Sequence, residues 1–380
     1  MLPEGWKEER LGDLCEKISD GIHTTPNYDE NSDVFFVNGN NIQTDGLNFF
    51  ENTKKVSQRD YEKYKKDIGS NTILMSINGT IGNTCLYNNE RVVLGKSACY
   101  LNIKKSIDLI FILHSLRSSH LQNYFLSELT GTTIRNLSLK TIKSSNILLP
   151  PLPEQKKIAA ILSTWDRAIE GTEELLANSQ QQKKALMQQL LTGKKRLPGF
   201  TGEWETLPFK KTAQLTKGSQ LNRLDCVSDG TFPVINGGIT PSGYTNEANR
   251  PAGTITISEG GNSCGYVDYQ KEKFWCGGHC YSVEQPKIFI EFLYQTLKFS
   301  QPTIMRLRVG SGLPNIQKKS LESLLIHHPI DTNEQKAIAA VLSSADEEIT
   351  ALESDLLRLR QEKKALMQQL LTGKRRVTVD

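Results

Sequence analysis

The chain has 380 residues, 37% of them hydrophobic, and a formal net charge of +4. No apolar run is long enough to cross a membrane and the N-terminus lacks a signal-peptide pattern, so we expect a cytoplasmic protein without membrane contacts. The 46 basic residues are nearly balanced by 42 acidic ones, which permits nucleic-acid binding without requiring it. Seven scattered cysteines indicate reduced thiols.

Residues 1–150 form the first predicted domain. Short β-rich runs with Gly, Asn and Pro between them alternate with helical stretches such as 57–66. The segment 72–79 is a strand-like run that leads into a glycine turn. A Gly-x-x-x-x-Asn motif, Gly131 to Asn136, lies near the end of the block. The pattern predicts an α+β domain.

Residues 151–197 are predicted to form one long helix. Apolar residues recur at steps of three and four, although Gly171 weakens the middle. A proline-rich turn precedes the helix and Gly193 is its predicted C-cap.

Residues 198–328 form a second predicted domain that resembles the first weakly. Its strand-like run is 254–261, its helical stretch 289–300, and its Gly-x-x-x-x-Asn motif runs from Gly310 to Asn315. Cys280-Tyr281 follows at nearly the same offset as Cys99-Tyr100 in the first block. We interpret the two blocks as diverged copies of one α+β domain.

Residues 329–380 repeat the helical segment. The string 183–194 recurs without change at 363–374, and across the longer match 26 of 43 positions are identical. A helix of about 38 residues spans about 57 Å, and its single apolar stripe requires a partner. The other copy is the expected partner; the alternative is that each helix packs on its own domain. We therefore predict two similar globular domains joined by two long antiparallel helices as a coiled coil, with a pseudo-twofold internal repeat.

The two kinds of segment have diverged to different extents. The helices still match, which suits one structural or docking role performed twice. The globular blocks have drifted while keeping a common pattern, which suits recognition of two different targets.

The residues around the start of each helix carry a specific resemblance. The string Leu149-Pro150-Pro151-Leu152-Pro153-Glu154-Gln155 and its continuation to Leu162 resemble the region that follows a target-recognition domain in specificity subunits of type I restriction-modification systems. The segment 334–342 and the Leu-Leu-Thr-Gly-Lys ends resemble it too. The resemblance covers the whole chain in the family's order. One departure is that 328–335 lacks the double proline.

The resemblance implies a non-catalytic subunit that binds double-stranded DNA. Residues 1–150 and 198–328 would be recognition domains, each binding one half of an asymmetric, interrupted target. The paired helices would act as a spacer and dock two methyltransferase subunits, and restriction-translocase subunits would complete the complex. Two alternatives remain open, a stand-alone DNA-binding regulator and a coiled-coil scaffold that binds proteins.

Motifs for catalysis or cofactors are weak. An adenine methyltransferase needs an Asn- or Asp-Pro-Pro-aromatic loop, and no such string occurs. Gly95-Lys96-Ser97 lacks the first glycine of a phosphate-binding loop, and Cys276, His279 and Cys280 lack a second ligand pair for zinc. We expect no catalytic residue, cofactor or metal.

Polar residues in loops are the candidates for DNA contact because they match base edges and phosphates. In the first block they are His23, Thr24, Thr25, Asn38, Asn40, Asn41, Asn78, Lys96, Arg135 and Asn136. In the second block they are Gln220, Asn222, Arg223, Asn236, His279, Arg306, Arg308 and Asn315. The Gly-Asn clusters are equally typical of turns. Arg306 and Arg308 would share one face if they lie on a strand.

Identical residues on the helices are the candidates for docking. A partner that binds twice requires the same surface at each copy. The candidates are Lys183, Lys184, Gln188 and Gln189, with their copies Lys363, Lys364, Gln368 and Gln369.

Overall fold

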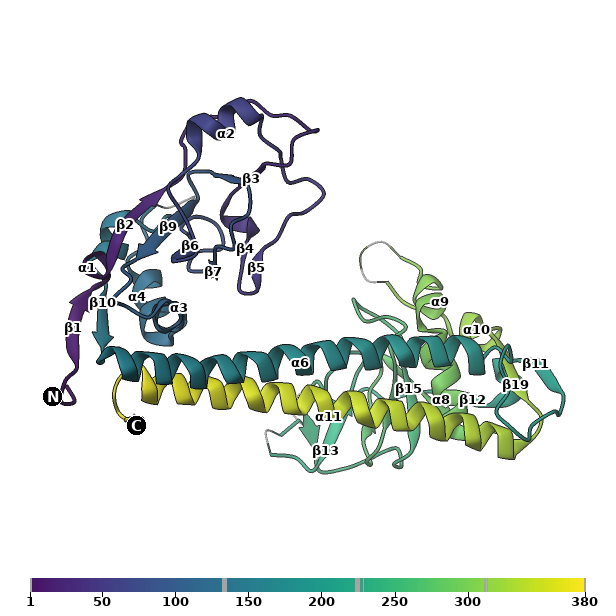
Figure 1. The fold of residues 1–380 in the computed structure, drawn as a ribbon. Coiled ribbons are helices and arrows are strands. Elements are labelled where there is room, and N and C mark those ends of the chain that lie inside the picture. Colours follow the sequence, from purple (N-terminus) through teal and green to yellow (C-terminus); the bar gives the residue numbers. More distant parts are fainter. Residues whose placement is uncertain are drawn as a thin grey trace. The chain divides into compact units, whose positions relative to one another are not determined.

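The structure is a computed structural model that describes residues 2–131, 135–222, 226–227, 229–310, 312 and 314–378. It divides into two compact units, one containing Met1–Glu173 with Asp355–Asp380 and the other Glu174–Ser354. Each unit holds one α+β domain together with part of each long helix (Figure 1). Within the described residues, no helix is both long and apolar enough to span a lipid bilayer.

The first unit is built on the four-stranded antiparallel sheet β2-β9-β6-β7. Three further pairs accompany this sheet, antiparallel β1–β10, parallel β3–β8 and antiparallel β4–β5. Its elements are β1 (Lys7–Arg10), α1 (Leu11–Leu14), β2 (Cys15–Asp20), β3 (Phe35–Val37), a 3-10 turn (Gly39–Asn41), β4 (Ile42–Gln43), β5 (Gly46–Leu47), α2 (Gln58–Tyr64), β6 (Thr72–Ser76), β7 (Thr84–Leu86), β8 (Val92–Leu94), β9 (Ala98–Ile103), α3 (Leu109–Arg117), α4 (Ser119–Ser127), α5 (Leu139–Ser144) and β10 (Asn146–Leu149).

The second unit repeats this topology. Its four-stranded sheet is β12-β18-β15-β16, accompanied by antiparallel β11–β19 and by the sheet β14-β13-β17, in which β13 and β17 are parallel. Its elements are β11 (Trp204–Pro208), α7 (Phe209–Thr212), β12 (Gln214–Lys217), β13 (Phe232–Ile235), β14 (Tyr244–Thr245), β15 (Thr254–Ser258), β16 (Val267–Gln270), β17 (Trp275–Cys276), β18 (Cys280–Glu284), α8 (Ile290–Phe299), α9 (Gln301–Arg306), α10 (Lys318–Glu322) and β19 (Leu325–Pro329). The predicted duplication of one α+β domain is confirmed.

One sequence match between the domains is wrong by one residue. In the first sheet Cys99 lies opposite Met75 of β6, whereas in the second sheet Tyr281 lies opposite Ile257 of β15. Since 72–76 matches 254–258, Tyr281 is equivalent to Cys99 and not to Tyr100. A shift of one residue reverses the face of a side chain, so the recurring Cys-Tyr pair has no common role.

The long helices are α6 (Leu152–Leu190) and α11 (Thr332–Leu370), each of 39 residues. Their expected ends are confirmed, because Gly193 and Gly373 have φ of 67° and 70° and close the C-termini. Both start alike despite the missing proline: the Gln155 amide donates to the Pro150 carbonyl, and the Gln335 amide donates to the Pro329 carbonyl, each at 2.8 Å.

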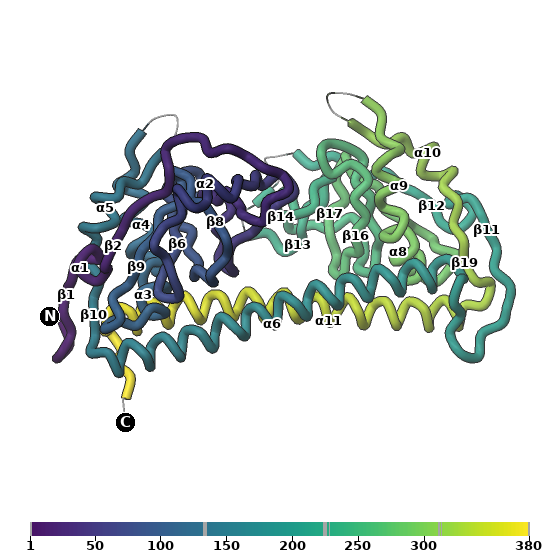
Figure 2. Tube along the Cα trace, turned by 45° about the horizontal axis from the view of Figure 1, so that its top comes forward, coloured from purple at the N-terminus to yellow at the C-terminus, as the bar shows by residue number. Residues whose placement is uncertain are grey.

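Ion pairs with the same 180-residue offset join the helices and their flanking segments within each unit. In the first unit Lys363 bonds to Asp166, and Arg376 bonds to Glu154 at 2.7 Å. In the second unit Lys183 bonds to Asp346 and Arg196 to Glu334. The partner number falls as the α6 number rises, so the helices run antiparallel, and Figures 1 and 2 show them side by side.

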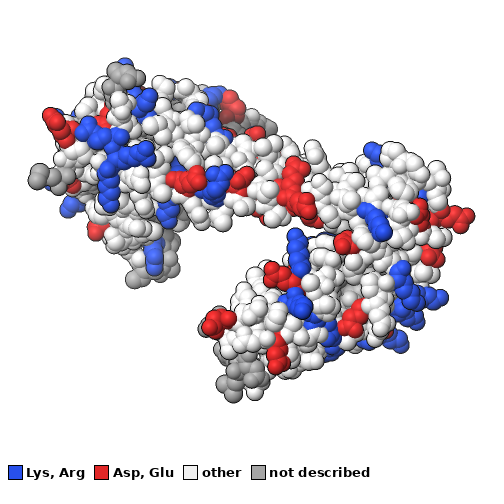
Figure 3. Space-filling view, turned by 90° about the horizontal axis from the view of Figure 1, so that it is seen from below, with Lys and Arg blue, Asp and Glu red and all other residues white. Residues whose placement is uncertain are grey.

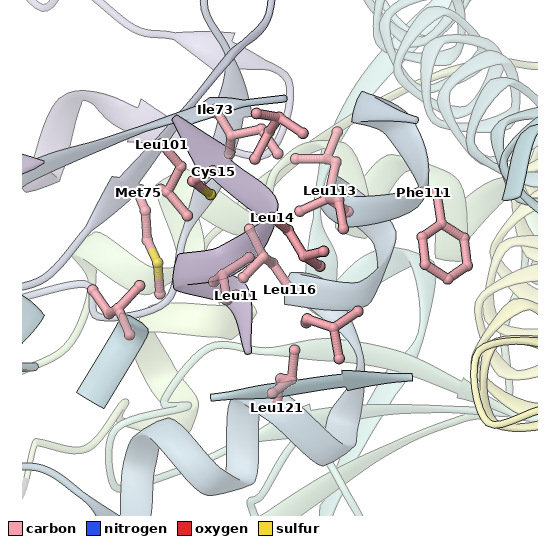
Figure 4. Close-up of a cluster of buried hydrophobic side chains, with 14 of the residues drawn as sticks. Leu11, Leu14, Cys15, Ile73, Met75, Leu101, Phe111, Leu113, Leu116 and Leu121 are labelled. Atoms are coloured by element: carbon pink, nitrogen blue, oxygen red, sulfur yellow. The ribbon is translucent and has the colours of Figure 1, made fainter. Parts of the chain in front are cut away.

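Each domain core includes pieces of both helices. In the first unit Ile158, Ala159 and Leu162 of α6 pack with Leu370 of α11 and Trp6 in one buried cluster. Figure 4 shows the part of this cluster beneath the sheet, with Leu11, Ile73 and Leu101 facing the leucines of α3 and α4. In the second unit Ile338, Ala339 and Leu342 occupy the equivalent places. The alternative that each helix packs only on its own domain is therefore wrong.

Candidate nucleic-acid interface

Several strands of the first domain end along one edge, and their connecting loops hold one another there. The Gly21 amide donates to the Ala98 carbonyl, and the Ile77 amide donates to the Ser97 carbonyl at 3.0 Å. A Cβ on Gly21 would lie 2.0 Å from the Leu94 carbonyl oxygen, so only glycine allows this approach. The loops that follow β2, β6 and β8 are thus fixed on a rigid sheet, the usual support of a binding site.

Most candidates of the first domain lie along this edge. The Ser97 hydroxyl donates to the side-chain oxygen of Asn38 at 3.0 Å, and Asn136 forms an isolated β-bridge with Asn78. Lys96 is exposed beside Ser97. The exposed candidates on these loops are His23, Thr24, Thr25, Asn40, Lys96 and Arg135.

Asn41 differs from its neighbours. Its side chain is buried, with 2% exposure, and its amide donates to the Asn48 carbonyl and the Thr53 hydroxyl while its oxygen accepts from the Asn38 amide. These bonds use the groups that would face a base. We therefore leave Asn41 out of the interface proposed below.

The second domain builds the same edge with the same backbone bonds. The Glu259 amide donates to the His279 carbonyl at 2.9 Å, as the Ile77 amide does to Ser97. The Ile316 amide donates to the Glu259 carbonyl, as the Leu137 amide does to Ile77. The two Gly-x-x-x-x-Asn motifs also correspond, because Val309 bridges Asn315 as Thr130 bridges Asn136.

The candidates of the second domain are only partly brought together. Asn236 lies on the edge, where its side-chain oxygen accepts from the His279 amide at 3.0 Å, and Gln220, His279, Arg308 and Asn315 are exposed there. The single strand expected for the two arginines is wrong: Arg306 is the last residue of α9, and Arg308 follows in the loop. Asn222 is exposed, whereas Arg223 lies outside the described residues.

The equivalent positions carry different chemistry. Ile77 and Ser97 of the first domain are replaced by Glu259 and His279, and Asp20, which pairs with His23 at 2.7 Å, is replaced by Lys217. Glu259 and Lys217 were not predicted: Glu259 was missed because carboxylates were not among the residue types considered for DNA contact, and Lys217 because its partner Glu259 was not considered. The signal was the alignment of 72–79 with 254–261.

Figure 3 shows acidic and basic side chains intermingled on the face that it displays. No cluster of three His, Cys, Asp or Glu suited to a metal ion occurs among the described residues. All seven cysteines are free thiols, and Cys276 and Cys280 are buried.

The docking candidates divide into two groups. Lys184, Gln188 and Gln189 are exposed, and so are their copies Lys364, Gln368 and Gln369. Lys183 and Lys363 are ion-paired between the helices, with 13% and 14% of their side chains exposed, and present little surface to a partner. In the first unit a groove of about 760 Å³ runs beside α11 and is lined by Lys364, Gln368 and His120.

The fold and these edges define a class: a duplicated, two-domain protein whose copies share a scaffold and differ in the side chains they present. The family model described as "Type I restriction modification DNA specificity domain" matches residues 3–178 and 202–359. The chain belongs to this family of type I restriction-modification specificity subunits.

Individual relatives agree over the whole length. A protein of Methanocaldococcus jannaschii, whose name proposes it as the specificity subunit of the type I restriction enzyme MjaX, is 27% identical over 420 residues, which is 99% of this chain and 95% of that protein. The crystal structure of a type I S subunit from M. genitalium superposes with a TM-score of 0.72 at 20% identity and covers 96% of both chains. A chain from a study of complex assembly in the type I system gives a TM-score of 0.58 at 18% identity, with 99% and 100% covered. These two structures share the fold.

Proposed function

We propose that this chain is the non-catalytic DNA-recognition subunit of a type I restriction-modification complex in the cytoplasm. Each domain binds one half of an asymmetric, interrupted target in double-stranded DNA. The observation that supports this most directly is the repeated edge: one set of backbone bonds holds Ile77 and Ser97 in one domain and Glu259 and His279 in the other. Edges with different side chains suit two different half-sites.

In this proposal, the long helices set the distance between the half-sites. A helix of 39 residues spans about 58 Å, whereas one turn of B-DNA spans about 34 Å. Such a length accommodates two readers with an unread spacer between them. The repeated ion pairs support a fixed pairing of the helices, because each helix carries the partner of the other at the matching position.

The exposed identical residues of the helices dock two methyltransferase subunits in this proposal. Two copies of one partner need two copies of one surface, and Lys184, Gln188 and Gln189 recur as Lys364, Gln368 and Gln369. The groove beside Lys364 and Gln368 offers a concave site for this contact in the first unit. Restriction-translocase subunits would join the methyltransferase complex.

Sequencing of methylated bases in cells that express the chain with its modification subunit tests the proposed function. We expect methylation in one bipartite motif whose two halves differ in sequence. A palindromic motif, or methylation independent of this chain, would contradict the proposal.

The spacing is tested by matched insertions of four residues at 180–182 and 360–362. Four helical residues add about 6 Å, so we expect the unread spacer to grow by roughly one to two base pairs while both half-sites stay unchanged. The measurement is the methylated motif of the double insertion. An unchanged spacer in an active variant would show that the helices do not set the distance.

Docking is tested by the double variant Gln188→Ala and Gln368→Ala. Both side chains are exposed, so the fold should tolerate the change, and we expect roughly tenfold weaker binding of the methyltransferase subunit. Affinity is measured by titration with the purified partner. The matched control is Lys156→Ala with Lys336→Ala, which alters an exposed identical pair at the other ends of the helices. Equal affinities of the two double variants would place the docking surface elsewhere.

A further inference from the structure

The edge of the second domain contains a carboxylate that a DNA-binding surface would ordinarily avoid. Glu259 directly follows β15, and 14% of its side chain is exposed. Phosphates repel a carboxylate, so an acidic group in such a place is compatible with DNA binding only when a nearby cation offsets its charge, and its remaining acceptor can then face a base.

One oxygen of Glu259 is held by two donors. Its Oε1 accepts from the Tyr281 hydroxyl at 2.9 Å and from the Lys217 ammonium at 2.7 Å. Burial and the neighbouring carboxylate raise the pKa of Tyr281, so the phenol keeps its proton and remains a donor. Both contacts fix the direction in which the second oxygen points.

The second oxygen of Glu259, Oε2, can still accept a hydrogen bond. Among the hydrogen bonds of the described residues none ends on Oε2, and Nδ1 of the His279 ring lies 3.9 Å from it. An ionised carboxylate accepts hydrogen bonds and donates none. The edge therefore presents an oriented acceptor beside the exposed His279.

The first domain has no counterpart of this arrangement. The position of Glu259 is taken by Ile77, which is 3% exposed, that of Tyr281 by Cys99, and that of Lys217 by Asp20. All three members of the group differ together while the backbone bonds around them are unchanged. A requirement of the fold would have retained the group in both domains.

We propose that Glu259 is a specificity-determining residue that accepts a hydrogen bond from the exocyclic amino group of a cytosine in the half-site bound by the second domain. This inference rests on the proposed function and adds to it which side chain contacts a base and which base that is. In the major groove guanine presents two acceptors and thymine one, and both repel a carboxylate. Adenine has an amino group, but its N7 acceptor lies beside it, whereas cytosine offers the amino donor alone.

The test is the methylated motif of cells that express Glu259→Gln with the modification subunit. The amide retains the size of the side chain but can place a donor where Oε2 was. We expect discrimination for cytosine at one base pair of one half-site to fall by about tenfold to a hundredfold, with every other position unchanged. The matched control is Glu284→Gln, since Glu284 pairs with Arg250 at 2.8 Å at the opposite end of β18; its motif should equal that of the wild type.

The outcomes separate this inference from the proposed function. An unchanged motif in a folded Glu259→Gln variant overturns the role of Glu259 and leaves the proposed function intact, whereas a wild-type complex without any bipartite motif contradicts the proposed function itself. If thermal melting shows that Glu259→Gln is unfolded, Glu259→Asp decides. Its carboxylate is one methylene shorter, so we expect roughly tenfold slower methylation with cytosine still required, and an unchanged rate overturns the role.

Discussion

The two units join their α+β domains to the long helices through the same geometry with different chemistry. In the first unit His114 of α3 faces α6, with Nε2 at 3.4 Å from the Ser163 hydroxyl and 3.8 Å from Asp166. In the second unit Gln295 of α8 donates to Asp346 at 2.8 Å. Asp166 and Asp346 each also accept from a lysine of the other helix.

The difference shows which parts of the junction are constrained. The Asp and Lys of the helices are repeated, because each pair must form in both units. The domain residue is constrained only to be polar at a buried place, and a histidine and a glutamine both satisfy this. One unit has thereby gained a titratable group that the other lacks.

Among the contacts that the two units share, we expect the buried glutamates at the starts of the helices to contribute most to the free energy of unfolding. Glu154 accepts from Arg376 and from the Trp6 indole at 3.1 Å, and its side chain is 3% exposed. Glu154→Ala leaves these donors unpaired, and we expect a loss of about 2–4 kcal/mol in the free energy of unfolding. The loss should be smaller than for a fully buried ion pair, because the Arg376 side chain is half-exposed and water can solvate it. Thermal or urea unfolding measures it.

Glu334→Ala makes the same change in the second unit. Glu334 is fully buried and binds Arg196 through two hydrogen bonds of 2.5 and 2.6 Å, but no tryptophan donates to it. We expect a similar loss confined to the second unit, visible by hydrogen exchange. Lys156→Ala is the exposed control, and a glutamate variant as stable as this control would mean that the repeated pair contributes no stability.

Sequence reasoning succeeded where the signal is local or repeated. The three-and-four spacing of apolar residues predicted both long helices, and the structure confirms them. Sequence reasoning failed where side chains far apart in the chain decide. Asn40 and Asn41 look alike in sequence, yet one is exposed and the other is buried by bonds to residues 48 and 53. The edge itself depends on the parallel pair β3–β8 and on the contact of Gly21 with Leu94. No local sequence pattern predicts either of these contacts.

The junction predicts a difference in acid sensitivity. Burial lowers the pKa of His114 from 6.5 to about 4; Asp166 opposes this, but Lys363 already neutralises that carboxylate. The unfolded chain binds the proton more readily, so stability is lost as pH falls through 6.5 and levels off below about 4. We expect His114→Gln to remove a loss on the order of 1–3 kcal/mol between pH 7.5 and 4.5.

Unfolding by urea at both pH values measures this change. Gln295→His is the reciprocal variant and should add an acid-dependent loss to the second unit. Equal pH dependence of His114→Gln and the wild type would show that the histidine is protonated equally well in the folded chain.

The smallest expected effect concerns the middle of the helices, where the copies differ at Gly171 and Ala351. Gly171 lies inside α6 and a Cβ there would meet no atom within 4 Å, so the position has room for alanine. Alanine restricts the unfolded backbone, and we expect Gly171→Ala to stabilise the protein by about 0.5–1 kcal/mol and Ala351→Gly to destabilise it by a similar amount. Melting of both variants measures the difference. If Gly171→Ala is neutral while Ala351→Gly is costly, the glycine of α6 is matched to a local bend that alanine opposes, and the two helices are less alike in their middle than at their ends.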